Sequence, residues 1–307
     1  MAFLPVALDW VENQLVVTRT SVGAPPDIKR GDVVELIDGV KAGDVLAGRE
    51  EQISSATPQW RRHRALSDLL AGAMGTHTDL RLRSGTTVRL TYASALVVDS
   101  LPEKISEVRP GIYYVDFSRI TDADFGAALS KLVAARGVVF DMRGYPRTVS
   151  TPNILSHLTN DTTRSARFQV PIITRPDRQA TTYRQGGWPV PPQTPRIPGK
   201  IAFLTGGGAV SYAETTMGIV EAFRLGEIVG ETTAGTNGNV NSFVATGGYN
   251  IAYTGMLVLK HDGSTHHGVG IKATIPAPRT IRGVAEGRDE ALERAIVAVG
   301  GRATVVP

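Results

Sequence analysis

Near residue 99 the pattern of the chain changes, and from there on short apolar strands alternate with helices. Two of the strands, Gly137–Met142 and Lys200–Thr205, are continuous apolar runs typical of buried strands. Helical spacing occurs at Asp122–Ala135 and at Ser211–Phe223. This alternation predicts an α/β (α+β) domain with a layered sheet over residues 99–307.

Residues 1–98 carry short strands in which apolar and polar side chains alternate, the pattern of a small half-buried sheet. Glycine can adopt a positive φ, so Asp38-Gly39 predicts a tight turn. We therefore expect a separate β-rich domain here. Its expected elements are strands at Gln14–Arg19, Gly31–Gly39, Asp79–Arg83 and Thr87–Tyr92 and a helix at Gln59–Ala71.

Composition excludes several kinds of site and partner. The chain has no cysteine, which excludes disulfides, thiolate catalysis and cysteine-based metal centres. No apolar run reaches the roughly 18 residues of a membrane-spanning helix, and no signal peptide is visible at the start. Basic residues are scattered apart from Arg61–Arg64, which fits a solvated helix face, so we expect no nucleic-acid partner.

Residues 186–198 are rich in proline. Proline lacks a backbone N–H and has a fixed φ, so this segment is not expected to form regular structure. It is predicted to be an exposed loop or a lid.

Ser211 begins a helix just after the glycines Gly206–Gly208. Glycines permit close backbone approach, and the unpaired N–H groups at a helix start carry the positive end of the dipole. These groups, with the N–H of Tyr212 first, are suited to stabilise an oxyanion beside Ser211. A capping box between Ser211 and Glu214 fits the same residues. Local physics leaves both interpretations open, but it excludes a phosphate loop and an α/β-hydrolase elbow.

Seven short segments between residues 111 and 271 form an ordered set. They are Gly111–Phe117, Gly137–Gly144, Lys200–Thr205, Ser211–Glu214, Ile228–Gly235, Tyr253–Met256 and His267–Ile271. In this order they resemble the bacterial tail-specific (C-terminal processing) serine peptidases of S41 type. The resemblance implies a ClpP/crotonase-like core that acts on polypeptides without cofactor or metal, is located outside the cytoplasm, and is compatible with a homo-oligomer.

The resemblance also assigns roles to individual residues. It makes Ser211 the nucleophile and gives the oxyanion hole to the N–H of Tyr212 and to the turn at Gly144. It places the polar loop Glu231–Asn239 beside the nucleophile, where Thr236 and Asn237 would orient substrate or a water. A plain surface loop is the alternative for this segment.

The general base of the family has no counterpart in this sequence. Where one branch has lysine, 25 residues after the serine, this chain has Thr236, and where another has histidine it has Asp116. Histidines and an aspartate gather in Lys260–Gly268, so His266 and His267 are candidate bases, with Asp116 a further one. A solvent-exposed turn at Asp262-Gly263 and a metal site are the alternatives for that segment.

The segment Lys29–Val40 resembles the strand and turn of a PDZ domain. Residues Phe3–Leu8 stand where that family has its carboxylate-binding loop, but they lack its glycines. Two roles therefore stay open for this domain, which are peptide capture by strand addition and a spacer.

Three functions follow as hypotheses. The first is hydrolysis of peptide bonds through Ser211, with a non-classical or missing base. The second is a catalytically inactive family member that binds peptides or hydrophobic ligands. The third is a crotonase-like acyl-transfer enzyme, suggested by the shared fold alone. Labelling of Ser211 by an activity-based probe separates the first from the second.

Overall fold

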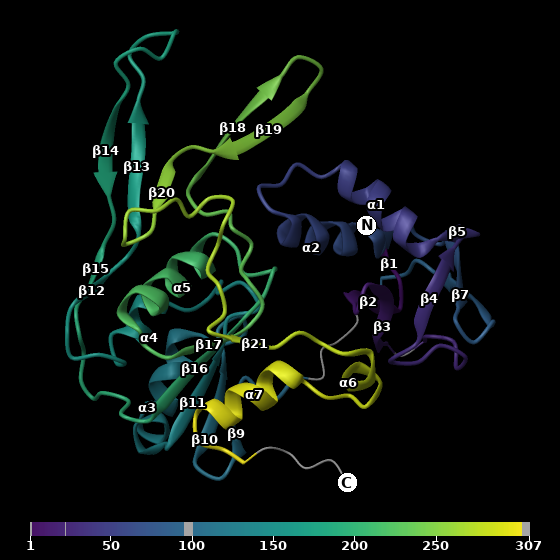
Figure 1. Ribbon diagram of the computed structural model, residues 1–307, viewed down its shortest axis with the longest axis horizontal. Coiled ribbons are helices and arrows are strands. Elements are labelled where there is room, and N and C mark those ends of the chain that lie inside the picture. The colour runs from purple at the N-terminus through teal and green to yellow at the C-terminus, as the bar shows by residue number, and fades with distance from the viewer. Residues whose placement is uncertain (1, 22, 95–100, 303–307) are drawn as a thin grey trace. The chain divides into compact units, whose positions relative to one another are not determined.

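The computed structural model describes residues 2–21, 23–94 and 101–302. The chain divides into two compact units: unit 1 is Met1–Leu101 with Ala277–Glu293, and unit 2 is Pro102–Pro276 with Arg294–Pro307 (Figure 1). The domain boundary expected between residues 98 and 99 lies outside the described residues. None of the described helices is long and apolar enough to cross a membrane.

Unit 1 contains an antiparallel sheet with helices packed on it. Its elements are β1 (Ala2–Phe3), β2 (Val6–Val11), β3 (Gln14–Thr20), β4 (Val33–Ile37), β5 (Val40–Lys41), α1 (Ala42–Glu51), α2 (Pro58–Leu69), β6 (Ala71–Gly72), β7 (His77–Leu82), β8 (Thr87–Thr91) and α6 (Ile281–Ala285). The sheet order is β2-β3-β4-β7-β8, with β5 paired to β4. Leu46 of α1 and Leu66 of α2 pack in one apolar cluster with Leu15 and Val17 of β3.

The predicted turn between β4 and β5 is confirmed. Ile37 pairs with Val40, and Asp38 and Gly39 between them both have positive φ, 48° and 82°. The Asp38 carboxylate accepts the backbone N–H of Asp79 at 2.8 Å, which ties the turn to β7. Helix α1 follows this turn directly and was not predicted from the sequence.

A segment from the end of the chain completes unit 1. Val284 of α6 packs against Val16 and Val33 of the sheet. Arg279 donates to the Asp9 carboxylate at 2.9 Å. This return of the chain to unit 1 was not predicted, because residues 277–293 have no pairing pattern that identifies their distant partners.

Unit 2 is organised around a six-stranded sheet. Its first elements are β9 (Ile105–Arg109), β10 (Ile112–Asp116), α3 (Asp122–Ala134), β11 (Gly137–Asp141) and α4 (Thr151–Leu155). Later come β16 (Lys200–Thr205), α5 (Tyr212–Phe223), β17 (Glu227–Gly230), β21 (Ile275–Pro276) and the part of α7 (Glu290–Ala298) from Arg294 onward. The strand order is β21-β17-β16-β11-β10-β9, and all neighbours are parallel except β9 with β10. The layered α/β fold expected from strand–helix alternation is thus confirmed.

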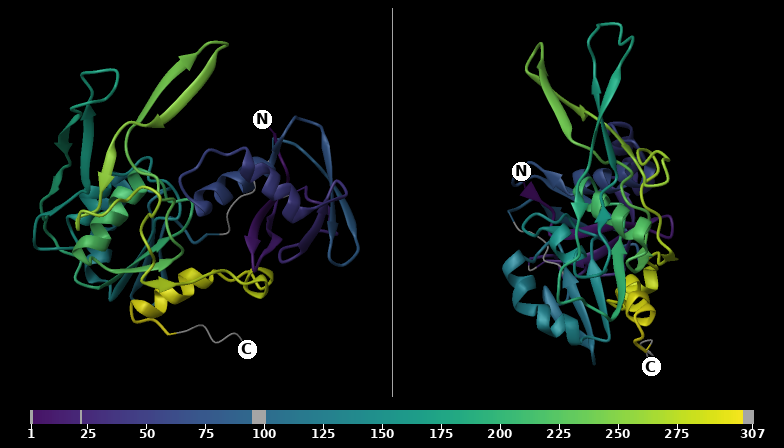
Figure 2. Two further views of the ribbon diagram at one scale, coloured as in Figure 1. Left: turned by 45° about the horizontal axis from the view of Figure 1, so that its top comes forward. Right: turned by 90° about the vertical axis from the view of Figure 1, so that its left-hand side faces the viewer.

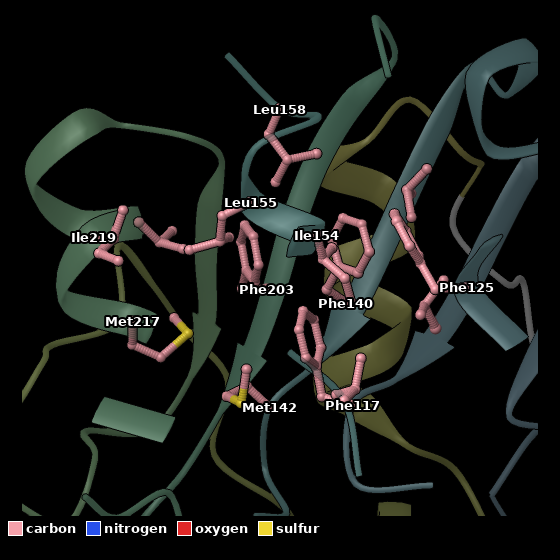
Figure 3. Packing of buried hydrophobic residues seen from close by; sticks show 14 of the residues in the cluster. Phe117, Phe125, Phe140, Met142, Ile154, Leu155, Leu158, Phe203, Met217 and Ile219 are labelled. Carbon is pink, nitrogen blue, oxygen red and sulfur yellow. The ribbon is translucent and has the colours of Figure 1, made fainter. Parts of the chain in front are cut away.

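Aromatic side chains form the centre of the unit 2 core (Figure 3). Phe140 lies 5.5 Å from Phe117 and 5.3 Å from Phe203 between ring centroids, so the three rings cross the sheet in a row. Phe125 of α3 and Met217 of α5 belong to the same buried cluster. The other face is covered near the C-terminus: Val299, just after α7, fills the space that a side chain at position 137 would need.

Two hairpins project from the same side of unit 2 in both views (Figures 1 and 2). One is β13 (Arg167–Ile172) with β14 (Thr182–Gly186), extended by β20 (Leu257–Leu259). The other is β18 (Val240–Ala245) with β19 (Tyr249–Thr254). Neither hairpin was predicted.

The proline-rich segment is less irregular than expected. Within it Pro189–Val190 forms β15, which pairs with β12 (Thr163–Arg164). Val190 and Ile197 are buried in the core of unit 2, and His157 Nδ1 lies 2.7 Å from the Pro195 carbonyl oxygen. Most of the segment is exposed, as predicted, but the expected lack of regular structure was wrong at β15, and Val190 and Ile197 anchor the segment.

Replacing Phe140 by alanine should lower the free energy of unfolding by about 3–5 kcal/mol, because a cavity would open in a closely packed row of rings. Phe243 of β18, which is 52% exposed, is the matched control, and its alanine variant should stay within about 0.5 kcal/mol of the wild type. Urea denaturation followed by circular dichroism measures both. Equal losses would contradict the packing described above.

Candidate active site

The carboxyl ends of β10, β11 and β16 lie in register and carry the site. Asp116 pairs with Asp141, and Asp141 pairs with Leu204. In open parallel sheets the loops that follow such aligned ends meet at one edge, where ligands bind. The loop after β16 runs through the glycines to Ser211, immediately before α5.

Ser211 has an unusual backbone conformation, with φ 56° and ψ −111°. A residue with a Cβ pays conformational energy in this region, and such strain persists only where the surroundings enforce it. The N–H of Ser211 donates to the Thr236 carbonyl at 3.1 Å, and its carbonyl accepts the N–H of Thr215 at 2.9 Å. Ser211 is therefore held from both sides by its main chain, while its hydroxyl makes no capping bond.

The capping-box interpretation is wrong. A capping serine has an extended backbone and bonds the helix with its hydroxyl, and Ser211 does neither. Glu214, the expected partner in the capping box, is fully buried, and its side chain hydrogen-bonds the loop of residues 233–236 instead. Its carboxylate accepts the Thr233 hydroxyl at 2.5 Å and the N–H groups of Gly235 and Thr236 at 2.7 and 2.9 Å.

A pocket of about 350 Å³ opens beside Ser211. Aromatic and aliphatic side chains form much of its wall, and amide groups and backbone complete it. The lining residues are Tyr145, Phe168, Val170, Arg184, Gln185, Gly186, Trp188, Ser211, Tyr212, Thr215, Asn237, Gly238, Asn239 and Met256. Phe168 and Trp188 pack against each other with ring centroids 5.3 Å apart.

Arg184 is the only formally charged residue among those that line the pocket, as far as the described part of the chain shows. No histidine, lysine, aspartate or glutamate belongs to that lining. Two tyrosines line the pocket: Tyr145, which follows β11, and Tyr212, which follows β16. The Tyr212 hydroxyl accepts the N–H of Thr151 at 3.1 Å, which fixes its ring against α4.

The turn after β11 is held by a buried carboxylate. Asp141 accepts the N–H of Arg143 at 3.0 Å and a hydrogen bond of 2.6 Å from its guanidinium. It also accepts the Tyr114 hydroxyl at 2.8 Å. Burial, together with the neighbouring carboxylates, raises the pKa of Tyr114, so this phenol stays a hydrogen-bond donor.

Gly144 lies in this turn, and a side chain there would lie 2.7 Å from the Cβ of Ser118. The position therefore requires glycine for close approach rather than for a positive φ. The next residue, Tyr145, reaches the pocket of Ser211. The turn thus lies next to the pocket, and its role in an oxyanion hole stays a prediction.

A family model for peptidase family S41 matches residues 111–277, more than half of the chain and all of its sheet from β10 onward. The chain belongs to peptidase family S41. Its substrate class is therefore polypeptide. No curated protein sequence matches it significantly.

Solved structures share the fold of this S41 chain at low identity. Mature CPAF is 15% identical with a TM-score of 0.72, over 93% of this chain and 79% of that one. A candidate peptidase from Parabacteroides merdae is 16% identical with a TM-score of 0.53, over 77% and 68%. The photosystem II D1 C-terminal processing protease is 17% identical with a TM-score of 0.46, over 94% and 78%. The first two similarities show the fold alone.

None of the three candidate bases lines the pocket of the S41 domain. His266 is buried behind Glu214, with Nε2 at 3.1 Å from Oε1 but out of line for a hydrogen bond. His267 is exposed. Asp116 binds the Arg119 guanidinium at 2.6 Å and the N–H of Ser118 at 2.8 Å, so its lone pairs are engaged.

The histidine segment forms a turn, as one alternative predicted. Gly263 has φ 91° and donates to the Lys260 carbonyl at 3.0 Å. His261 Nε2 lies 2.8 Å from the Arg164 carbonyl oxygen, whereas His266 Nε2 lies near the Glu214 carboxylate. Among the described residues, no group of three histidine or carboxylate side chains is arranged to hold a metal ion.

The polar loop of the S41 domain lies beside the serine, and its residues differ in role. Asn237 lines the pocket, and its side chain exchanges hydrogen bonds with Thr215 at 3.0 to 3.2 Å. Thr236 contributes its backbone, through the bonds to Ser211 and Glu214.

Sequence reasoning missed the residues that the β13–β14 hairpin, the proline-rich segment and the chain just after β19 bring to the pocket. Trp188 carried a usable signal, since a tryptophan among prolines is unusual for a solvated loop. No signal in the sequence links the others to Ser211. They are Phe168, Val170, Arg184, Gln185 and Met256.

Replacing Glu214 by glutamine should lower the free energy of unfolding by about 2–4 kcal/mol, because an amide NH2 would then face N–H donors in a buried site. Glu221, also in α5, is the matched control. Its bond to Lys260 at 3.0 Å is partly solvent-exposed, so Glu221→Gln should cost about 1 kcal/mol or less. Thermal and urea denaturation measure both variants, and a larger loss at Glu221 would contradict the assigned role of Glu214.

Proposed function

We propose that the chain hydrolyses peptide bonds of polypeptide substrates, with Ser211 as the nucleophile. The observation that carries this proposal is the strained backbone of Ser211 beside a pocket, at the start of a helix. A helix cap needs no such conformation, whereas presenting a hydroxyl to a ligand is a function for which strain is retained. Membership of a peptidase family supports the same assignment.

Backbone N–H groups that could stabilise the oxyanion lie close to Ser211. Tyr212 is the first residue of α5, and its N–H donates to no acceptor within the described parts of the chain. The positive end of the helix dipole favours negative charge there, and fixed N–H groups stabilise a tetrahedral intermediate. A backbone N–H from the turn around Gly144 and Tyr145 would supply the second donor.

The wall of the pocket favours an apolar or aromatic substrate side chain. Phe168, Trp188 and Tyr145 offer ring surfaces, and amide groups such as Gln185 offer hydrogen bonds to a peptide backbone. Arg184 favours a carboxylate nearby over a lysine. This combination supports an uncharged side chain in the pocket, with tolerance for an acidic neighbour.

Activation of Ser211 is the weak element of the site. With no imidazole, amine or carboxylate among the lining residues, the hydroxyl has no conventional proton acceptor there. In serine peptidases that lose the triad, the oxyanion hole and substrate binding alone retain about 10³–10⁴-fold acceleration over water. We therefore propose slow turnover for this chain.

The same lack of a base favours a second candidate, a family member that binds polypeptides without cleaving them. Pocket, donors and loop would then serve recognition alone. Binding would be retained in this case and Ser211 would be unreactive.

An activity-based fluorophosphonate should label the wild type, and Ser211→Ala should abolish the label, because the probe reacts with a serine beside oxyanion donors. Ser118, a second serine near the strand ends, bonds Asp116 at 2.6 Å, and Ser118→Ala is the control that should keep the label. In-gel fluorescence measures the outcome. If the label survives Ser211→Ala, or if the wild type never reacts, Ser211 is not the nucleophile. The binding function is then the hypothesis that remains.

The pH dependence of labelling tests the proton acceptor. Without a titrating base the rate should rise about tenfold per pH unit as hydroxide removes the proton, with no inflection near the imidazole pKa of about 6.5. Rates from pH 5.5 to 9 measure this. A plateau above pH 7 would reveal a histidine base that does not line the pocket.

We further propose a PDZ-like role for unit 1 and a location outside the cytoplasm. Support for the first is that β2 is an edge strand of its sheet and contacts α2, the arrangement that accepts an added peptide strand. The second, like a homo-oligomer, rests on the family resemblance alone.

A further inference from the structure

The β18–β19 hairpin is made of uncharged residues. From residue 232 to residue 259 the chain contains no aspartate, glutamate, lysine, arginine or histidine. This stretch includes the hairpin that projects from unit 2 in both views (Figures 1 and 2). Within this stretch residues 239–253 are exposed almost throughout, and an uncharged, exposed hairpin with large apolar side chains points to a partner.

One face of the hairpin is apolar and aromatic. Strand register places Phe243 opposite Ile251, with Tyr249 and Tyr253 on the same face. These four side chains are between 43% and 73% exposed. We call them the aromatic face. Phe243 and Tyr253 meet edge to face with ring centroids 6.5 Å apart, so the face is preorganised.

Both outer edges of the hairpin are open. Among the described residues, β18 and β19 pair only with each other, so each strand presents unpaired backbone N–H and C=O groups on its outer side. Soluble proteins usually protect such edges with lysine or proline, and neither occurs in these strands. The edges are therefore suited to receive a further strand.

The aromatic face leads into the pocket of Ser211. The N–H of Gly255 donates to the Asn239 carbonyl at 2.8 Å, which extends the strand ladder beyond β18. Side chains alternate along a strand, so Asn239 lies on the same side as Phe243. Asn239 lines the pocket, as do its neighbour Gly238 and, after β19, Met256.

We propose that the hairpin is an exosite for the polypeptide substrate, which binds there as an extended, uncharged, apolar segment. The aromatic face packs against alternate side chains of this segment, and an outer strand edge pairs with its backbone. The segment is continuous with the residue held in the pocket. A strand of six residues, like β18, spans about 20 Å. This inference takes from the proposed function only that the ligand is a polypeptide. It does not require that Ser211 reacts with that ligand.

The strand ladder of the hairpin continues to the pocket, and this favours a substrate segment over other ligands of the aromatic face. A second copy of the chain, or a lipid surface, would cover the aromatic face equally well. Neither accounts for a face whose strand ladder continues to residues that line the Ser211 pocket. The absence of charge over the whole stretch also matches a neutral segment, because a charged one would lose hydration with nothing to compensate it.

Fluorescence anisotropy with two labelled peptides tests the exosite. The long peptide carries an apolar residue for the pocket followed by about six alternating valine and threonine residues, and the short peptide ends after the pocket residue. Phe243→Thr and Tyr253→Thr should each weaken the long peptide about tenfold and leave the short one unchanged. Threonine keeps the strand propensity, so the hairpin should remain folded.

Val244→Thr is the matched control, because Val244 is exposed in the same strand on the opposite face. Its effect on the long peptide should be less than twofold. Circular dichroism and the melting temperature should not change in any of the three variants. Equal losses for Val244→Thr and Phe243→Thr, or a long peptide that binds no tighter than the short one, would overturn the exosite.

Two further outcomes would assign the surface elsewhere. A dimer in sedimentation velocity that Phe243→Thr dissociates would make a second copy the occupant. Binding to phosphatidylcholine vesicles that Phe243→Thr abolishes would make it a lipid surface. Fluorophosphonate labelling of the same variants reports Ser211 separately, so peptide binding without labelling would reject the reaction and retain the exosite.

Discussion

The buried carboxylate of Glu214 determines the geometry around the candidate nucleophile. A carboxylate removed from water is tolerated only when hydrogen-bond donors replace the lost hydration. Thr233, Gly235 and Thr236 supply those donors, and they come from one loop. The loop is thereby fixed against α5, and the Thr236 carbonyl takes the N–H of Ser211. The positive φ of Ser211 follows from a main chain held at both of its polar groups.

A second carboxylate has a similar role on the neighbouring strand. Asp141 holds the turn that carries Gly144 and Tyr145, with Arg143 and the Tyr114 hydroxyl as partners. Both carboxylates therefore shape the site without entering the pocket. Their charge is taken up by donors inside the protein, and the pocket lining keeps the single charge of Arg184. As far as the described residues show, the pocket lining therefore contains fixed backbone but no imidazole, amine or carboxylate.

Much of the fold could be predicted because burial leaves a pattern in the sequence. The core strands β11 and β16 are continuous apolar runs, and the Asp38-Gly39 turn needs a residue that accepts positive φ. Helix α1 was missed, and its weak contrast between buried and exposed positions explains why: among its ten residues only Ala42 and Leu46 are buried. The two hairpins bury little, and the alternation of Tyr249, Ile251 and Tyr253 that β19 does carry was overlooked in the sequence.

The site was predictable in position but not in detail. Ser211 and Glu214 have the spacing of a capping box, and nothing within those four residues reveals that Glu214 bonds a loop about twenty residues later. The positions of the candidate bases could not be predicted for the same reason, and none of them lines the pocket. His266 and His267 are adjacent in sequence, yet one is buried against Glu214 and the other faces solvent. Only tertiary structure separates neighbours in this way.

The hairpin beside the pocket carries no charge, and the described pocket lining carries only that of Arg184, which has one physical consequence. Charge complementarity contributes mainly to association rate and to rejection of wrong partners. A surface without charge must recognise its ligand by apolar contact and by backbone hydrogen bonds, and the second of these requires an extended chain. A folded protein offers such a chain at its termini, in its exposed loops and at open strand edges. The proposed selectivity therefore depends on the conformation of the substrate as much as on its sequence, and a loosely folded segment would be bound where the same residues in a packed domain would not.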